Sequence, residues 1–422
     1  MKTLFKQIIS DFHTWELKKV FPRTLKVPLQ TGKIISLIWP RRAGKTSLLF
    51  NVMQSLLQQG KDKKDIVYVN FEDERIHIQG EQLHVIIDAY MELYPDKDIQ
   101  QTFFFFDEIQ NITGREKFIR RIYDQGMSNL FITGSNAKLL SKEIATALRG
   151  RSLSFELLPL SFSEFLTFKQ EDLNPHVSKE KAKLLHLQTE YLQWWGFPEI
   201  LPFEEDLKIK TLQEYFDVML YNDIIERYSV KEASLLKQFI KHLLQTTTKE
   251  YSISKISNTL KSQGFSFDKN LPYTFVDYLA TVYFGKSIAK YDHSFKRQTL
   301  KKRYLFDNGY LNALSFNFSD NVWKLLENAV FTELWRVFGD HIYFLKGREE
   351  TDFVIDEKEN IVLQVCYHLH DQDREREISG CLEAMKQFNV KQSFIITADQ
   401  EEAFLQDGKE IIILPFYKWA KN

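Results

Sequence analysis

The residues best suited to chemistry lie in the segment WPRRAGKT, residues 39–46, which follows an apolar run and opens an amphipathic one. This segment ends like the phosphate-binding loop G-x-x-x-x-G-K-[ST], in which backbone N–H groups cradle phosphates, the lysine reaches the β- and γ-phosphates and the threonine ligates Mg²⁺. One position departs from that pattern, because Trp39 stands where a glycine normally relieves the turn, and weakened or reshaped nucleotide binding is therefore an open alternative. We expect ATP to bind through Arg42, Ala43, Gly44, Lys45, Thr46 and Ser47.

An acidic pair supplies the second half of the expected site. The run FFFF at 103–106 predicts a fully buried strand, and Asp107 and Glu108 follow at its carboxyl end, where α/β proteins bind ligands. Asp107 would hold Mg²⁺ together with Thr46 and water, and Glu108 would orient or deprotonate the attacking water. A solvated acidic pair is the alternative for these two residues taken alone. Their combination with Gly-Lys-Thr favours catalysis, with Lys45 and Glu108 as catalytic groups.

Further candidates follow the next expected strand, NLFITG. Thr133, Ser135 and Asn136 would lie beside the γ-phosphate, either as sensors of it or as ordinary loop residues. Arg149 and Arg151 could act as arginine fingers from a neighbouring subunit, stabilising charge in the transition state. That role would require a homo-oligomer, and a structural ion pair is the equal alternative.

The elements that must position these residues alternate along the front third of the chain. Continuous apolar strands separated by amphipathic helices predict a parallel sheet covered on both faces, an α/β fold. The strands are expected at 35–39, 66–71, 102–109 and 129–134, and the helices at 46–60, 83–94 and 117–125.

The remainder of the chain changes character twice. Residues 162–244 read as mostly helical, and two further helices at 251–264 and 270–284 precede a basic strand pair at 286–306. Two helices followed by a hairpin are the outline of a winged helix. After residue 321 a last α/β unit begins with a long helix and continues through strands, a helix and a strand.

Composition narrows the class of protein. A chain of 422 residues with 44% hydrophobic and 27% charged residues is typical of a globular protein with several domains. The formal net charge of −1 means that nucleic-acid binding would need a local basic face. The two cysteines, Cys366 and Cys381, fit a reducing compartment, and no run approaches the roughly 18 apolar residues of a membrane span. We therefore expect a cytoplasmic protein that does not bind membranes.

Phrases along nearly the whole chain resemble a known group of proteins. They include RRAGKTSLL, VNFEDER, FFFDEIQNI, ITGSNAKLLS, LRGRSLSFELLPLSFSEF, WWGFPEI, YNDIIERY, LFDNGYLNAL, LLENAVFTELWR, EETDFVI and LQVCYHLHDQDREREI. The group is that of prokaryotic AAA-type P-loop ATPases with a C-terminal winged-helix and restriction-endonuclease-like domain of unknown function. The resemblance implies ATP binding, oligomeric behaviour and a link to DNA, genome defence or mobile elements, without an established substrate.

The resemblance also implies a division into domains. They would be an AAA-type P-loop ATPase core at 1–166, a helical lid and connector at 167–245, a winged-helix-like domain at 246–320 and a restriction-endonuclease-like α/β domain at 321–422.

In that last domain, the resemblance implies a metal site made of a helix Glu, a strand Asp and a Glu-x-Lys pair. The aligned positions hold Glu327, Asp352, Gln364 and Cys366. A neutral Gln364 weakens the anionic cage that Mg²⁺ prefers, and Cys366 removes the lysine that would support water activation. Lys346 on the preceding strand could take the role of that lysine. We expect a degenerate domain used for structure or binding.

A basic segment, KSIAKYDHSFKRQTLKKRY, is the candidate DNA-binding surface. On a wing, its residues would neutralise phosphates without reading sequence. The helix before it carries Asp277 and no Arg or Lys, which argues against base readout. Packing between domains or subunits is the alternative use. The residues expected to contact DNA are Lys296, Arg297, Lys301, Lys302 and Arg303.

The sequence thus predicts an ATP-binding and ATP-hydrolysing AAA-type ATPase that acts as a nucleotide-driven conformational switch on DNA. The alternative is a nucleotide-binding regulator of protein partners with little hydrolysis, which Trp39 favours. An ATP-dependent nuclease is the third hypothesis, and Gln364 and Cys366 count against it.

Overall fold

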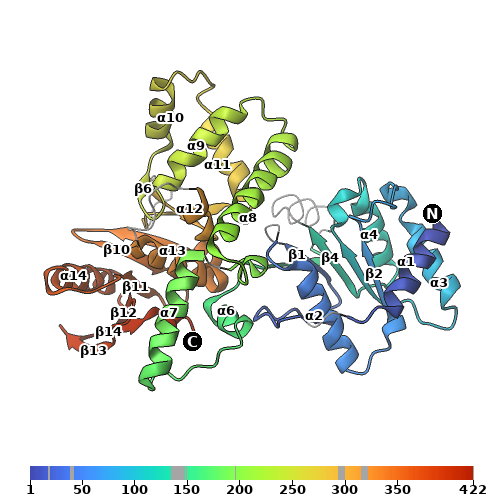
Figure 1. The fold of residues 1–422 in the computed structure, drawn as a ribbon, viewed down its shortest axis with the longest axis horizontal. Helices are drawn as coiled ribbons and strands as arrows, with labels where there is room; N and C mark the ends of the chain where they lie inside the picture. Colours follow the sequence, from blue (N-terminus) through green and yellow to red (C-terminus); the bar gives the residue numbers. More distant parts are fainter. Residues whose placement is uncertain are drawn as a thin grey trace. The chain divides into compact units, whose positions relative to one another are not determined.

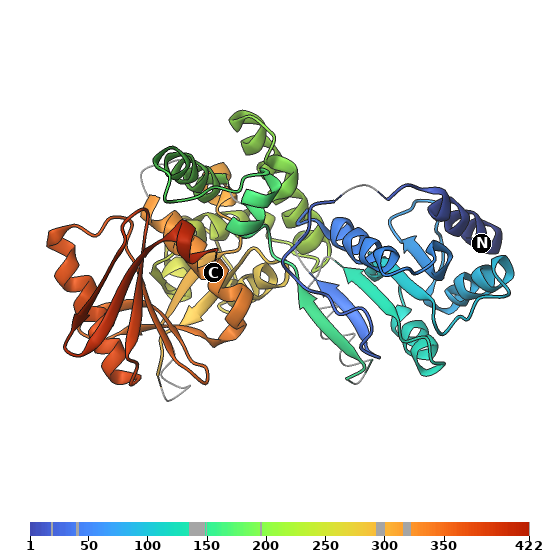
Figure 2. The same cartoon turned by 90° about the horizontal axis from the view of Figure 1, so that it is seen from below.

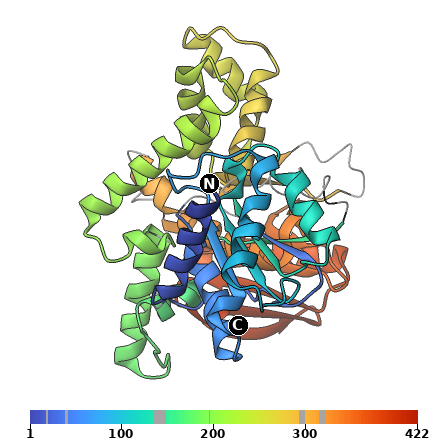
Figure 3. The same cartoon turned by 90° about the vertical axis from the view of Figure 1, so that its right-hand side faces the viewer.

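The chain folds as two compact units, Met1–Leu158 and Pro159–Asn422. The structure, a computed structural model, describes residues 1–17, 20–38, 42–134, 148, 150–194, 196–292, 300–314 and 322–421. The first unit is coloured blue to teal in Figures 1 and 3, and the second runs from green to red.

The first unit is built on a parallel sheet. Among the described residues, this sheet has the strand order β2-β3-β4-β1-β5, and each neighbouring pair is parallel. The predicted α/β fold with a parallel sheet is therefore confirmed in this unit (Figure 1). The strands are β1 (Ile34–Ile38), β2 (Ile66–Asn70), β3 (Phe103–Asp107), β4 (Leu130–Gly134) and β5 (Ser152–Glu156).

The four phenylalanines of β3 show why its sequence is apolar throughout. Phe103 and Phe105 belong to the core that packs beneath α2. On the opposite face, Phe104 contacts Tyr90 of α3 and Phe106 contacts Phe118 of α4, with ring centroids 6.2 and 5.9 Å apart. Side chains alternate across a strand, so this strand must be apolar on both faces. The surrounding helices are α1 (Lys2–Thr14), α2 (Lys45–Gln58), α3 (His84–Leu93) and α4 (Arg115–Asp124).

The second unit begins with helices. A π-helix, η6, continues directly from α8, and π-helical segments of this kind are rare in proteins. The elements are α6 (Phe162–Phe168), α7 (Ser178–Trp194), the short η5 (Pro198–Ile200), α8 (Glu205–Val218), η6 (Met219–Glu226) and α9 (Ala233–Gln245).

A small module of three helices and three short strands follows. Helices α9, α10 and α11 pack together, as Figure 1 shows. Within the described part of this module, the antiparallel sheet has the order β6-β8-β7. Its further elements are β6 (Glu250–Tyr251), α10 (Ile253–Ser262), α11 (Leu271–Thr281), β7 (Gly285–Ala289) and β8 (Lys301–Leu305), and α12 (Gly309–Leu314) comes after them.

The last part is a mixed sheet, coloured orange to red in Figure 2, with the order β13-β14-β12-β11-β10-β9 among the described residues. Helix α14 contributes Ile378, Cys381, Ala384 and Met385 to the core on one face, and α13 contacts β8, β9 and β11. The elements are α13 (Val322–Phe338), β9 (Ile342–Lys346), β10 (Glu350–Ile355), β11 (Ile361–Val365), α14 (Asp371–Gln387), β12 (Gln392–Thr397), β13 (Glu402–Gln406), β14 (Lys409–Pro415) and α15 (Phe416–Trp419).

Across the described ranges, no helix combines the length and the apolar character that crossing a membrane requires.

Candidate functional site

The end of the expected phosphate-binding loop has a left-handed backbone. Gly44 is the residue before α2 and has a φ of 94°, and Arg42 also has a positive φ, 69°. A side chain at Gly44 would be strained in that conformation, so glycine is required there. Lys45 and Thr46 then begin α2, where free N–H groups and the helix dipole favour an anion. The predicted effect of Trp39 lies outside the described residues and stays a prediction.

Asp107 at the end of β3 is buried and held by three hydroxyl groups. Its Oδ2 accepts hydrogen bonds from Thr46 Oγ1 at 3.2 Å and from the Tyr68 hydroxyl at 3.1 Å. Its Oδ1 accepts from Thr133 Oγ1 at 2.5 Å. Burial and the charge of Asp107 raise the pKa of Tyr68 well above its usual value, so the phenol remains a donor. Thr46 and Asp107, the expected Mg²⁺ ligands, are therefore brought together as oxygen donors.

Glu108 has a strained backbone and a confined side chain. Its φ is 53°, a left-handed conformation that is uncommon for a residue with a Cβ and that often marks a functional site. Its N–H donates to Thr133 Oγ1 at 2.8 Å. Its carboxylate forms an ion pair with Lys45 and accepts a hydrogen bond from Gln110. The loop lysine and the proposed catalytic base are thus in direct contact.

The site contains residues that the sequence did not single out. Tyr68 lies on β2 with its Cα paired to that of Phe105 on β3, and Gln110 follows Glu108 by two residues. The only sequence feature that could have indicated Tyr68 was its hydroxyl group among the apolar residues of β2. Thr133 was expected beside a phosphate, whereas its hydroxyl contacts Asp107 and the Glu108 backbone. Ser135 and Asn136 lie outside the described residues.

Of the two candidate arginine fingers, only Arg151 is among the described residues, and it lies away from this site in its own chain. Arg149 lies outside the described residues. Arg151 precedes β5 and pairs with Asp124 of α4, with Nε and Oδ1 3.0 Å apart. Because β5 runs parallel to β1, Arg151 lies at the edge of the sheet where the strands begin. The phosphate-binding loop and Glu108 lie at the opposite edge, where β1 and β3 end. Action on a neighbouring copy stays a prediction.

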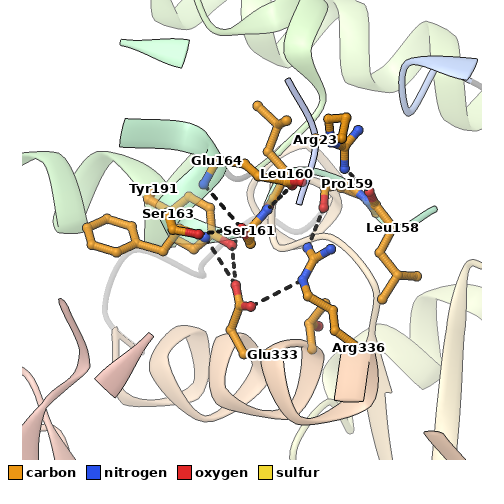
Figure 4. Close-up of polar contacts among 12 residues, drawn as sticks. Arg23, Leu158, Pro159, Leu160, Ser161, Ser163, Glu164, Tyr191, Glu333 and Arg336 are labelled. Carbon is orange, nitrogen blue, oxygen red and sulfur yellow. Dashed lines mark hydrogen bonds and ion pairs between the residues drawn. The ribbon is translucent and has the colours of Figure 1, made fainter. Parts of the chain in front are cut away.

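Arg23 connects the phosphate-binding loop to the last residue of the first unit. Its Nη1 donates to the Ala43 carbonyl at 2.9 Å. Its Nη2 donates to the Leu158 carbonyl at 2.6 Å (Figure 4). One guanidinium therefore binds both the loop and the residue at which the chain leaves this unit.

The following residues are anchored within the second unit by a separate network (Figure 4). Arg336 donates to the Pro159 carbonyl, and Tyr191 donates to the Leu160 carbonyl at 3.0 Å. Glu333 pairs with Arg336 at 3.2 Å and accepts from the Tyr191 hydroxyl at 3.1 Å. The first residues of this unit are thus fixed by the buried Tyr191 of α7 and by two partly buried side chains of α13.

A second polar cluster brings together the residues aligned with a nuclease metal site. Glu327 lies on α13, Asp352 on β10 and Gln364 on β11, and the Asp352 N–H donates to Gln364 Oε1 at 2.9 Å. Lys302 of β8 is also there, 2.9 Å from Asp352 Oδ1 and 3.5 Å from Glu327 Oε1. Within the described residues, no group of three or more His, Cys, Asp or Glu side chains is arranged to hold a metal ion.

The burial of Lys302 in this cluster corrects the expected DNA-binding surface. Lys302 and Arg303 of β8 are only 2% and 1% exposed, and Lys302 is enclosed by carboxylates of β10 and α13. They cannot present their charges to phosphates in this conformation, and only Lys301 is exposed among the three. Lys296 and Arg297 lie outside the described residues.

Neither Lys346 nor Cys366, the residue at the aligned lysine position, supplies a free ammonium group to the cluster. Lys346 pairs at the surface with Glu250, at 2.7 Å. Burial raises the pKa of the Cys366 thiol to about 12, so it stays protonated near neutral pH.

Comparison with known proteins matches the front and the middle of the chain to family models. A family described as an AAA domain matches residues 31–166, and a domain of unknown function, DUF8612, matches residues 185–321. The uncharacterized protein MJ1544 of Methanocaldococcus jannaschii is 36% identical over 433 residues, which cover 99% of this chain and 95% of that protein.

Two further comparisons are more distant. An uncharacterized protein of Haemophilus influenzae is 30% identical over 391 residues, covering 90% of this chain and 92% of that protein. Among solved structures, the Walker-type ATPase PABY2304 of Pyrococcus abyssi aligns with 75% of this chain and 96% of its own, at 14% identity and a TM-score of 0.40.

Proposed function

The chain belongs to the family of the uncharacterized protein MJ1544 and carries an AAA domain, and from this premise we propose that it binds Mg·ATP and hydrolyses it to ADP and phosphate. One observation carries the proposal. The loop residues Lys45 and Thr46 directly contact the acidic residues Glu108 and Asp107. A lysine, a hydroxyl and two carboxylates at one edge of a parallel sheet are the groups that phosphoryl transfer from ATP to water needs.

Each residue would have a separate task. The N–H groups at the start of α2 and the Lys45 ammonium would bind the phosphates, and Thr46 and Asp107 would hold Mg²⁺. These donors fit Mg²⁺ because both are oxygens that already lie within 3.2 Å of each other. When bound, Mg²⁺ would neutralise charge on the β- and γ-phosphate oxygens. Glu108 would accept a proton from the attacking water.

The ion pair between Lys45 and Glu108 gives nucleotide binding a consequence for catalysis. A γ-phosphate that binds the Lys45 ammonium would compete with the Glu108 carboxylate for it. Glu108 would then exchange its ammonium partner for a water molecule. In this proposal, the base becomes available only when the substrate is in place.

Lys45→Ala tests the binding site. Without the ammonium, we expect the affinity for Mg·ATP to fall by at least about 10-fold, since a charge-assisted hydrogen bond to phosphate contributes about 1.5–3 kcal/mol. Titration of a fluorescent ATP analogue measures the change. Lys117→Ala, an exposed position on α4, is the matched control. Equal affinity of Lys45→Ala and the wild type would remove Lys45 from the site.

We further propose that hydrolysis drives a conformational switch in the second unit, and that the switch acts on DNA. Arg23 supports the first part, since it binds both the loop carbonyl of Ala43 and the carbonyl of Leu158. The order α9, β6, α10, α11, β7, β8 with the sheet β6-β8-β7 supports a winged-helix assignment for the small module. Exposed Lys255, Lys261 and Lys301 lie on this module. A neighbouring copy supplying Arg149 or Arg151 belongs to the same proposal.

The DNA proposal makes a salt-dependent prediction. Neutralising Lys301 together with Lys296 and Arg297 should weaken binding of a short duplex and reduce its salt dependence, because phosphate contacts release counterions. Fluorescence anisotropy at several salt concentrations measures both effects. Neutralising Lys117, an exposed lysine of the first unit, is the control. Binding that is indifferent to the triple change would favour the alternative function, a nucleotide-binding regulator whose small module packs against proteins.

A further inference from the structure

A buried lysine is surrounded by carboxylates in the second unit. Lys302 reaches from β8 to the Oδ1 of Asp352 at 2.9 Å and to the Oε1 of Glu350 at 2.5 Å, both on β10. Glu327 of α13 is 3.5 Å away. The lysine side chain is 3% exposed and those of Glu327 and Asp352 are 6% and 10% exposed. Three elements from different parts of the chain thus meet around one ammonium group.

The donor oxygens that a metal ion would need are already engaged by the protein. Asp352 Oδ1 binds Lys302, and Asp352 Oδ2 accepts from the Val365 N–H at 3.1 Å. Gln364 Oε1 accepts from the Asp352 N–H at 2.9 Å, and its Nε2 donates to Glu377 at 2.5 Å. These residues therefore do not fit the metal site that the resemblance to restriction endonucleases implies.

We propose that the Lys302 ammonium is the resident cation of this cluster, standing where a nuclease would hold a divalent metal, and that it joins β8 to β10 and α13. A tethered cation balances the buried carboxylates without any exchangeable ion. The cluster thereby connects β8 of the small module to β10 of the mixed sheet and to α13. This inference does not depend on the ATPase activity proposed for the first unit.

The electrostatics of the cluster agree with a charged lysine. Burial works to lower the pKa of Lys302, but Tyr304, Asp352, Glu327 and Glu350 together outweigh it, so its pKa lies well above the usual value. Burial raises the pKa of Glu327 to about 8 against the opposing effect of Lys302. Glu327 also accepts a hydrogen bond from the Tyr304 hydroxyl at 2.7 Å. Removing the ammonium would leave the buried Asp352 carboxylate without its counter-charge, which is more damaging than never having had the pair.

A rival interpretation gives Lys302 the role of a relocated catalytic lysine in a working nuclease. That interpretation requires the wild-type protein to bind a divalent metal through Asp352. Calorimetric titration of Mn²⁺ into the wild type and into Asp352→Asn separates the two, since any metal bound in the ATPase unit is common to both. We expect identical titrations. Mn²⁺ binding that disappears in Asp352→Asn, or Mn²⁺-dependent cleavage of DNA that does so, would overturn the proposal.

Substitution of the lysine gives a second, independent test. Lys302→Met keeps the length of the side chain and removes its charge, and we expect the melting temperature to fall on the order of 10 °C. Lys301→Met, the exposed neighbour on the same strand, is the matched control and should melt like the wild type. A Lys302→Met protein that also melts like the wild type would contradict the proposal, and the wild-type titration decides the question if that variant does not fold.

Discussion

At the scale of single residues, the Thr133 hydroxyl connects both acidic residues of the candidate site. It donates to Asp107 Oδ1 at 2.5 Å and accepts from the Glu108 N–H at 2.8 Å. Asp107 and Glu108 are buried, so water cannot readily replace this hydroxyl as the partner of Asp107 Oδ1 and of the Glu108 N–H. Thr133 is therefore a positioning residue in the proposed reaction.

Thr133→Val keeps the shape of the side chain and removes this connection. We expect kcat for ATP hydrolysis to fall about 10-fold or more, because an unmade buried hydrogen bond costs roughly 1–3 kcal/mol. The KM for ATP should change less, since Lys45 is untouched. Steady-state ATPase assays of Thr133→Val, with Thr133→Ser as the variant that retains the hydroxyl, measure the split. An equal fall in kcat in both variants would show that the Thr133 hydroxyl does not account for the effect.

The sequence predicted the residues of the nucleotide site more readily than their partners. Gly44, Lys45 and Thr46 are adjacent in the chain, and Asp107 and Glu108 end an apolar strand, so local pattern was enough. Tyr68 and Gln110 gave no such pattern, because their role depends on which strand lies beside β3. The burial of Lys302, which was expected to be exposed on the wing, was missed for the same reason. Nothing local in KKRY shows that β8 is central in its sheet or that carboxylates from α13 and β10 surround the lysine.

At the scale of elements, Arg23 links the phosphate-binding loop to Leu158, the second residue after β5. It donates to Ala43 in the loop and to Leu158, the last residue of the first unit. The next carbonyl along the chain, that of Pro159, accepts from Arg336 in the second unit. The consecutive carbonyls of Leu158 and Pro159 are therefore bound by arginines from different units. A movement of the loop could displace Leu158 and, through the few residues that follow it, the start of α6.

This contact predicts an effect of ATP on residues 157–164. We expect Mg·ATP to change the rate of amide hydrogen exchange of that segment in the wild type, and Arg23→Gln to abolish the change while retaining ATP binding. Hydrogen exchange followed by mass spectrometry measures both proteins. Arg75→Gln is the control, since that exposed arginine pairs with its neighbour Asp73. Persistence of the ATP effect in Arg23→Gln would show that coupling takes another route.

The elements themselves were predictable where their burial was simple. Strands β1 to β4 of the parallel sheet are buried almost throughout, and they were expected close to where they lie. Strand β5, with the sequence SLSFE, was not expected, because its residues are largely exposed and it lies at the edge of the sheet. Hairpin β13–β14 was also missed. Its turn, Asp407-Gly408, has φ values of 52° and 71°, and the Asp-Gly pair typical of such turns was the available sign.

At the scale of the whole molecule, an AAA domain is followed by a unit that contains no comparable nucleotide motif in its sequence. The second unit begins at Pro159 and combines helices, a small antiparallel module and a mixed sheet. If Lys302 is the resident cation of that sheet, the second unit responds to nucleotide through its connections and has no metal chemistry of its own. The account as a whole therefore depends on whether the first unit hydrolyses ATP.

Mg·ATP binding and hydrolysis, measured side by side for the wild type and Glu108→Gln, test this most directly. Glutamine is close to glutamate in shape but cannot accept the proton of water, so Glu108→Gln should bind ATP while its turnover falls by about 100-fold or more. Glu74→Gln, at an exposed position of the same unit, should hydrolyse ATP like the wild type. Wild-type turnover with bound ATP retained in Glu108→Gln is the result that the account predicts. Unchanged turnover in Glu108→Gln, or binding without turnover in the wild type, would contradict it.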